Sequence, residues 1–208
     1  MTLRSKLLLA FVLLLIVAAS VLVLRSSLRK AQFARQVQSM QAAEADELKA
    51  LPRSLQLSSP DLASDGQYVP ALTCRGAGRS PALAWSNVPM QVQSYVLMMV
   101  DWDSPTPQDP PASFTHWLLY NIPSPTVGLA AGVSDAQLRQ SGIEAGENSL
   151  GTRTYLGLCP PAVHRYRLRL FALDVAHIAP ATPGRTAVAA AMAGHVLAFG
   201  ELEGRFGD

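Results

Sequence analysis

Two carboxylates and a histidine stand at the ends of apolar runs in the middle of the chain. Asp101 and Asp103 follow residues 94–100, SYVLMMV, and His116 lies at the start of residues 115–122, THWLLYNI. Apolar runs of this length, separated by a proline-rich loop, predict buried β-strands. Because the ends of neighbouring strands meet at the rim of a sheet, we expect these side chains to line one pocket.

A third run adds polar groups of the same kind. His164 opens residues 164–173, HRYRLRLFAL, and Tyr166 shares its face because side chains alternate along a strand. Gly157 and Cys159 precede this run in a turn that contains two prolines. Gly157 leaves room for the backbone to approach a ligand, and exposed N–H groups in such a turn attract anions.

These residue types predict a small anion pocket. Histidines donate hydrogen bonds to anions, and an aspartate beside a histidine fixes its tautomer. The carboxylates could meet a cationic group on the same ligand. Other interpretations stay open, because a D-x-D pair is often a turn or a calcium ligand pair and a histidine at a strand start is often structural. No residue close in the sequence activates Cys159, so we do not expect it to be a nucleophile.

The rest of the pattern favours a mainly β fold. Residues 165–170 alternate arginine with apolar residues, which predicts a strand with one solvated and one packed face. Two helices are expected, over residues 134–140 with Ser134 as N-cap and over residues 186–198, which include His195. Strands with long loops and few helices predict a β-sandwich.

The most apolar stretch lies at the front of the chain. Residues 7–24 are 18 consecutive residues without a charge, and as a helix they would span about 27 Å, close to a bilayer's hydrocarbon core. The run is longer than a usual secretory signal, so residues 1–25 are expected to be an uncleaved anchor. A cleaved signal and a buried core helix are the alternatives. Residues 26–53 then form a helical stalk or a flexible tether, and the domain occupies residues 54–208.

Charge and cysteine content exclude several classes of protein. Residues 1–35 contain six basic side chains and no acid, whereas the rest contains 11 basic and 15 acidic ones. The domain is therefore acidic and lacks the basic surface of a nucleic-acid-binding protein. Basic residues flank both ends of the apolar run, so orientation rests on the short amino-terminal tail, which we expect to stay in the cytoplasm. Cys74 and Cys159 show no C-x-x-C spacing; they are either a disulfide or two buried thiols.

In combination, the motifs over residues 54–207 resemble those of the phosphatidylethanolamine-binding protein family, and most of all its bacterial Raf kinase inhibitor-like branch. The motifs follow the family's order: SPALAW (80–85), VP (88–89), DWDSP (101–105), FTHW (114–117), ENSLG (147–151), GLCPP (157–161), HRY (164–166) and GHVLA (194–198). Two departures are Trp102, where the family usually has proline between two aspartates, and Arg75, where many relatives have aspartate.

The resemblance implies an antiparallel β-sandwich with a few peripheral helices and a pocket for phosphate-type anions, including phospholipid headgroups and phosphorylated side chains. Carried over position by position, the ligand-binding residues are Asp101, Asp103, His116, Gly157, Cys159, His164 and Tyr166. No cofactor or metal is implied.

We therefore expect a single-pass protein of the bacterial inner membrane with a periplasmic binding or regulatory domain. Its partners would be a phosphate-type anion or phospholipid headgroup and, by analogy with the family, a kinase or protease that it inhibits. We do not expect an enzyme. The alternatives are a hydrolase of small esters or phosphates, with Asp101 or His116 as general base, and a structural envelope protein with a vestigial pocket.

Overall fold

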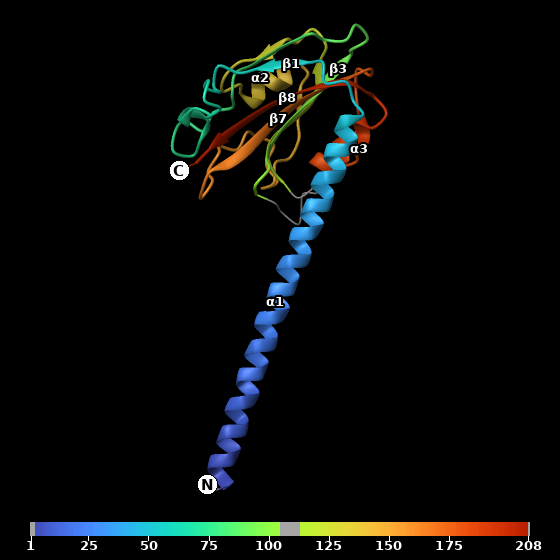
Figure 1. Cartoon of the computed structure of the whole chain (residues 1–208). Helices are drawn as coiled ribbons and strands as arrows, with labels where there is room; N and C mark the ends of the chain where they lie inside the picture. Colours follow the sequence, from blue (N-terminus) through green and yellow to red (C-terminus); the bar gives the residue numbers. More distant parts are fainter. Residues whose placement is uncertain (1–2, 105–112, 208) are drawn as a thin grey trace. The chain divides into compact units, whose positions relative to one another are not determined.

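The computed structural model describes residues 3–104 and 113–207 (Figure 1). Pro105, the last residue of the DWDSP motif, lies outside the described residues. Contacts between residues divide the chain into two units, Met1–Ala43 and Glu44–Asp208, and each is treated by itself.

The first unit is helical. Helix α1 runs Leu3–Lys49, so it includes the apolar run and continues through most of the expected stalk. Side chains 11–24 are exposed. Within the described part of the chain, α1 is the one helix long and apolar enough to cross a membrane, with a mean hydropathy of 2.4 in its most apolar window. A signal sequence has the same properties.

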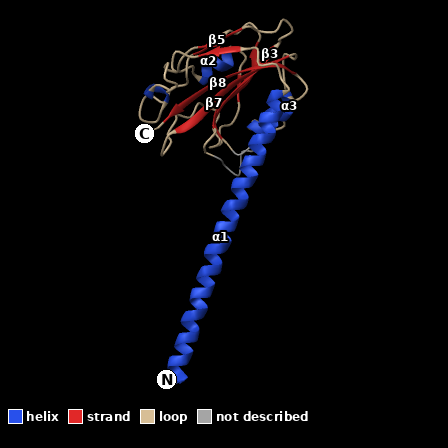
Figure 2. Cartoon of the chain, viewed as in Figure 1, coloured by secondary structure: helices blue, strands red, loops and turns tan. Residues whose placement is uncertain are grey.

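The second unit contains two antiparallel sheets. The smaller sheet has the order β1-β2-β5, with β1 Gln56–Ser58, β2 Leu83–Ser86 and β5 Gly128–Leu129. The larger sheet has the order β6-β4-β3-β7-β8, with β3 Ser94–Asp101, β4 Phe114–Pro123, β6 Glu144–Ala145, β7 His164–Leu173 and β8 Val196–Phe206. Strands and loops dominate this unit (Figure 2). The predicted mainly β fold with few helices is confirmed.

Strand β3 lies at the centre of the larger sheet because both of its faces are apolar. Tyr95, Leu97 and Met99 pack into a core shared with the smaller sheet, which contributes Trp85. The alternate residues of β3 face a second core on the other side of the sheet. All eight residues of β3 are buried, as expected for a continuous apolar run covered on two faces.

Three short helical segments lie between the strands in the sequence. A 3-10 turn occupies Pro70–Leu72, helix α2 occupies Asp135–Gln140, and helix α3 occupies Arg185–Met192. Ser134 is the N-cap of α2, as predicted, and it forms a reciprocal capping box with Gln137. Val188 and Met192 of α3 pack into the second core.

The predicted helix over residues 186–198 is wrong in its carboxy-terminal half. Helix α3 ends at Met192, and Gly194 has a φ of +81°, a left-handed conformation that ends the helix. The chain then enters β8, which pairs with β7 over most of its length. His195 therefore lies between the turn at Gly194 and β8 rather than on a helix. Alanine-rich composition favoured a helix locally, but pairing with β7 determined the structure.

The predicted solvated face of residues 165–170 is correct only at its beginning. Arg165 is exposed, whereas Arg169 is 4% exposed. Arg169 donates from Nε to Glu201 at 2.6 Å and from a terminal nitrogen to Glu44 in the last turns of α1. The alternating pattern predicted that the Arg169 guanidinium is exposed to water. It is instead buried, and these two carboxylates neutralise its charge.

Candidate functional site

The candidate site lies where β3 and β7 pair at one end of the larger sheet. Asp101 is the last residue of β3 and pairs with Tyr166 of β7, two residues after His164. His164 Nδ1 lies 2.8 Å from Asp101 Oδ2, and the second carboxylate oxygen accepts a hydrogen bond from Asp103 N at 3.0 Å. Asp101 is only 4% exposed. A buried carboxylate thus fixes the His164 ring, as predicted for an aspartate beside a histidine.

The second imidazole is held by the backbone. His116 of β4 is buried, and its Nδ1 lies 2.8 Å from the carbonyl oxygen of Leu156. A carbonyl can only accept, so Nδ1 carries the proton. Burial lowers the pKa of His116, and the Leu156 carbonyl offsets that effect only in part. At neutral pH the ring is therefore uncharged, and its Nε2 carries a lone pair.

The turn around Gly157 is fixed by contacts distant in the sequence. Leu158 N donates to Leu72 O and Leu158 O accepts from Cys74 N, each at 3.1 Å. Cys74 and Cys159 form a disulfide, which decides between the two interpretations of these cysteines. A Cβ at Gly157 would lie 3.2 Å from Cys74 N. Glycine permits this close approach, and the turn becomes a rigid wall.

These elements enclose a pocket of about 360 Å³. Six of the seven predicted ligand-binding residues line it: Asp101, His116, Gly157, Cys159, His164 and Tyr166. Apolar groups complete the wall: Phe114, Leu150, Leu156, Pro160 and Pro161. A volume of this size fits a small ligand group among apolar walls with a few polar groups.

Asp103, the seventh predicted residue, is not among the residues that line the pocket. Its carboxylate accepts from the backbone N and from Nε of Arg165, both at 2.9 Å. The Arg165 guanidinium lowers the pKa of Asp103. Asp103 therefore fixes the loop after β3 to β7, beside the site rather than in it.

Tyr166 contributes a buried hydroxyl close to the pocket. The residue is fully buried, and its hydroxyl lies beside the Asp101 carboxylate. Burial, and next the Asp101 carboxylate, raise the pKa of this hydroxyl. Tyr166 therefore keeps its proton and remains a hydrogen-bond donor.

Trp102 does not line this pocket, although it lies between the two aspartates. It is 8% exposed, and the Arg167 guanidinium lies 4.0 Å above its ring. The replacement of the family's usual proline thus adds a cation–π contact beside the site.

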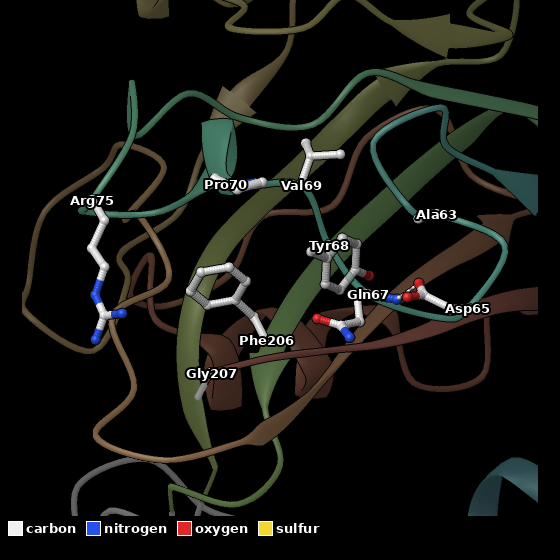
Figure 3. Close-up of a pocket in the computed structure, with 9 residues that line it drawn as sticks. All are labelled: Ala63, Asp65, Gln67, Tyr68, Val69, Pro70, Arg75, Phe206 and Gly207. Atoms are coloured by element: carbon white, nitrogen blue, oxygen red, sulfur yellow. Dashed lines mark hydrogen bonds between the residues drawn. The ribbon is translucent and has the colours of Figure 1, made fainter.

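A larger cavity of about 460 Å³ lies outside the predicted site (Figure 3). Tyr68, Arg75 and Phe206 are among its lining residues, together with Asp65 and Gln67. The Asp65 carboxylate accepts from Gln67 N at 3.0 Å. None of the seven predicted residues lines this cavity, and it holds no histidine. The smaller pocket is therefore the better candidate site on chemical grounds.

Within the described residues, no three His, Cys, Asp or Glu side chains cluster in a way that could hold a metal ion. The groups that converge are hydrogen-bonding ones. Sequence reasoning missed the Leu156 carbonyl, which fixes the His116 tautomer, because that contact joins residues 40 positions apart.

Comparison with known proteins agrees with this geometry. The family model described as phosphatidylethanolamine-binding protein matches residues 59–207. The chain belongs to the phosphatidylethanolamine-binding protein family. A UPF0098 protein of Methanothermobacter thermautotrophicus is 38% identical over 142 residues, which cover 68% of this chain and 91% of the relative.

Solved structures show the same fold. A phosphatidylethanolamine-binding protein homolog from Chlamydia trachomatis has 30% sequence identity and a TM-score of 0.65, and the match covers 75% of this chain and 99% of that one. YbcL of Escherichia coli, at 24% identity and a TM-score of 0.65, shares the fold over 74% of this chain and 99% of its own. The family resemblance seen in the motifs is thus confirmed.

Proposed function

We propose that this protein is a membrane-anchored binding domain whose pocket takes a small phosphate-type group, on a phospholipid headgroup or a phosphorylated ligand. One observation carries the proposal: two histidines and a buried tyrosine line one pocket of about 360 Å³. Each imidazole has its Nδ1 already occupied, by Asp101 or by Leu156. The other ring nitrogen is therefore available to a ligand. Inhibition of a kinase or protease partner stays a prediction from the family resemblance.

The four histidines make the proposal testable by NMR. The full chain in detergent micelles is titrated with inorganic phosphate and with phosphoethanolamine, and the imidazole signals are followed. We expect those of His116 and His164 to shift saturably. Those of His177 and His195, which do not line the pocket, are internal controls and should stay still. Unmoved His116 and His164 signals up to millimolar ligand would contradict the assignment.

We propose that α1 anchors the domain in the membrane. Its length and hydropathy support this role. The test is the mass and the fractionation of the expressed chain. An intact amino terminus in the membrane fraction, with release after deletion of residues 1–25, is expected. A mature mass that lacks the apolar run would instead identify a cleaved signal sequence.

We propose binding rather than catalysis at this pocket. The sulfur of Cys159 is bonded to Cys74 and cannot attack a substrate. The alternative, a hydrolase with Asp101 or His116 as general base, is tested with p-nitrophenyl acetate and p-nitrophenyl phosphate. Turnover that disappears in His116→Ala while the variant stays folded would establish the enzyme instead.

A further inference from the structure

We propose that the pocket selects phosphate groups that carry a proton and rejects anions of the same shape and charge that carry none. This inference rests on the proposed function and names the ligand class for the same site. It follows from which atoms in the pocket can donate and which can accept a hydrogen bond.

His116 is an acceptor. Its Nδ1–H is committed to the Leu156 carbonyl at 2.8 Å. The ring is 5% exposed, and neutral imidazole has one donor and one acceptor. Nε2 is therefore a lone pair, which attracts a ligand hydroxyl and repels a bare anionic oxygen.

The buried Asp101 carboxylate also favours a protonated ligand over a dianion. Asp101 is a buried lining residue with both carboxylate oxygens engaged, one by His164 and one by Asp103 N. Among the described lining residues it is the only acidic side chain, and none is lysine or arginine. A dianion beside a buried carboxylate is costly. Loss of one charge by protonation makes a phosphate group easier to accommodate.

One hydroxyl donor lies close to the pocket for another ligand oxygen. The Tyr166 hydroxyl is buried beside the Asp101 carboxylate, and its O–H can turn from that carboxylate to a ligand oxygen. The titratable groups around His116 are Asp101, His164 and Tyr166, from β3 and β7. A monobasic phosphate can donate its hydroxyl proton to His116 Nε2 and accept from Tyr166. A sulfate ester offers acceptors only, so it leaves the Nε2 lone pair facing an anionic oxygen.

Methyl phosphate and methyl sulfate are a matched pair for the test. At about pH 5.5, below the second pKa of about 6 of a phosphomonoester, both are largely monoanions of similar shape, and only methyl phosphate carries a proton. Binding to the full chain in detergent micelles is measured by calorimetry and by the His116 and His164 NMR signals. We expect methyl sulfate to bind about tenfold or more weakly, because it leaves a buried polar group unpaired.

The pH dependence is a second readout on the unmodified protein. Above the ligand's second pKa, the affinity for methyl phosphate should fall by up to about tenfold for each pH unit as the monobasic form disappears. His116→Gln should bring the two affinities together, because a carboxamide both donates and accepts. His195→Gln, outside the pocket, should retain the difference.

The outcomes separate this inference from the proposed function. Equal affinity for methyl phosphate and methyl sulfate would overturn proton selection while leaving an anion pocket in place. Binding of neither ligand at millimolar concentration would overturn the proposed function, and this inference with it. Unchanged methyl phosphate affinity from about pH 5.5 to about pH 8 would also refute proton selection, whether or not the His116 variant folds.

Discussion

His164 Nδ1 lies 2.8 Å from Asp101 Oδ2, and this contact joins the ends of β7 and β3 across 63 residues of sequence. The side chains are 16% and 5% exposed, respectively. The pair therefore does two things: it satisfies a buried carboxylate, and it sets the direction of the free nitrogen of His164. The geometry of the site depends on the register between these two strands.

A double-mutant cycle should show strong coupling within this pair. His164→Ala leaves the Asp101 carboxylate buried without its imidazole partner, so it should destabilise the protein more than the same change made in an Asp101→Ala background. We expect a coupling free energy of about 1–3 kcal/mol, measured by urea unfolding at neutral pH.

The His195–Asp174 pair is a matched control. Its Nδ1–Oδ1 distance is 2.9 Å, but both side chains are 44% exposed. Solvent should reduce its coupling to between about 0 and 1 kcal/mol. Equal coupling free energies in the two pairs would mean that burial of Asp101 does not strengthen its interaction with His164.

Burial of His116 should make stability depend on pH. The folded-state pKa is lowered from 6.5 by burial, so the unfolded chain binds the proton more readily than the folded one. The contribution of His116 to the free energy of unfolding is fully present above about pH 6.5. It declines as the pH falls toward the folded-state pKa, by up to about 1.4 kcal/mol per pH unit.

The prediction is measured from urea midpoints at about pH 7.5 and about pH 5.5 for the natural sequence and for His116→Gln. The variant should lose less stability between these two pH values. Asp61 and Asp103 do not interfere in this window. The Arg79 guanidinium lowers the pKa of Asp61 below 3.8, and the Arg165 guanidinium does the same for Asp103. The stability that these two carboxylates contribute is therefore lost only at more acidic pH. Parallel pH profiles for the two proteins would contradict a buried neutral His116.

Strands with strong local signals could be predicted from the sequence. The apolar runs over residues 94–100 and 115–122 are buried strands, and the segment 164–173 is a strand with the predicted bounds. The polar residues at the ends of these strands lie together at one rim of the sheet, as predicted. The apolar pattern that predicts a strand also predicts where it ends. This reason holds for Asp101, His116 and His164, whereas Gly157 and Cys159, which also line the pocket, came from the family resemblance.

Features that depend on distant partners could not be predicted. Residues 196–206 form β8 because β7 offers a pairing edge, which local composition does not reveal. Asp103 turns away from the pocket because Arg165 binds it across the strand ends. The Leu156 carbonyl that contacts His116 lies beside a turn that backbone hydrogen bonds join to Leu72 and Cys74, and local sequence shows neither contact.

Arg169 provides a test of one such unpredicted contact. Its side chain is 5% exposed and lies between Glu44 and Glu201. Arg169→Met keeps much of the side-chain volume but leaves two carboxylates without their shared cation. We expect a loss of about 3–5 kcal/mol, measured by chemical unfolding of the full chain in micelles. Arg165→Met, at a side chain that is 51% exposed, is the control and should cost less than about 1 kcal/mol.

The disulfide should support both the stability and the pocket. Cys74 and Cys159 are 85 residues apart, so the bond restricts a long loop in the unfolded chain, and its removal should cost about 2–5 kcal/mol. Both residues line the pocket, so Cys74→Ser/Cys159→Ser should also weaken methyl phosphate binding. The weakening should be smaller than in His116→Ala, because the backbone hydrogen bonds between Cys74, Leu158 and Leu72 still hold the wall. Thermal unfolding and calorimetry of the double variant, compared with the reduced natural sequence, measure the two effects. An unchanged melting temperature after reduction, or free thiols in the protein as isolated, would show that the bond does not stabilise the native state.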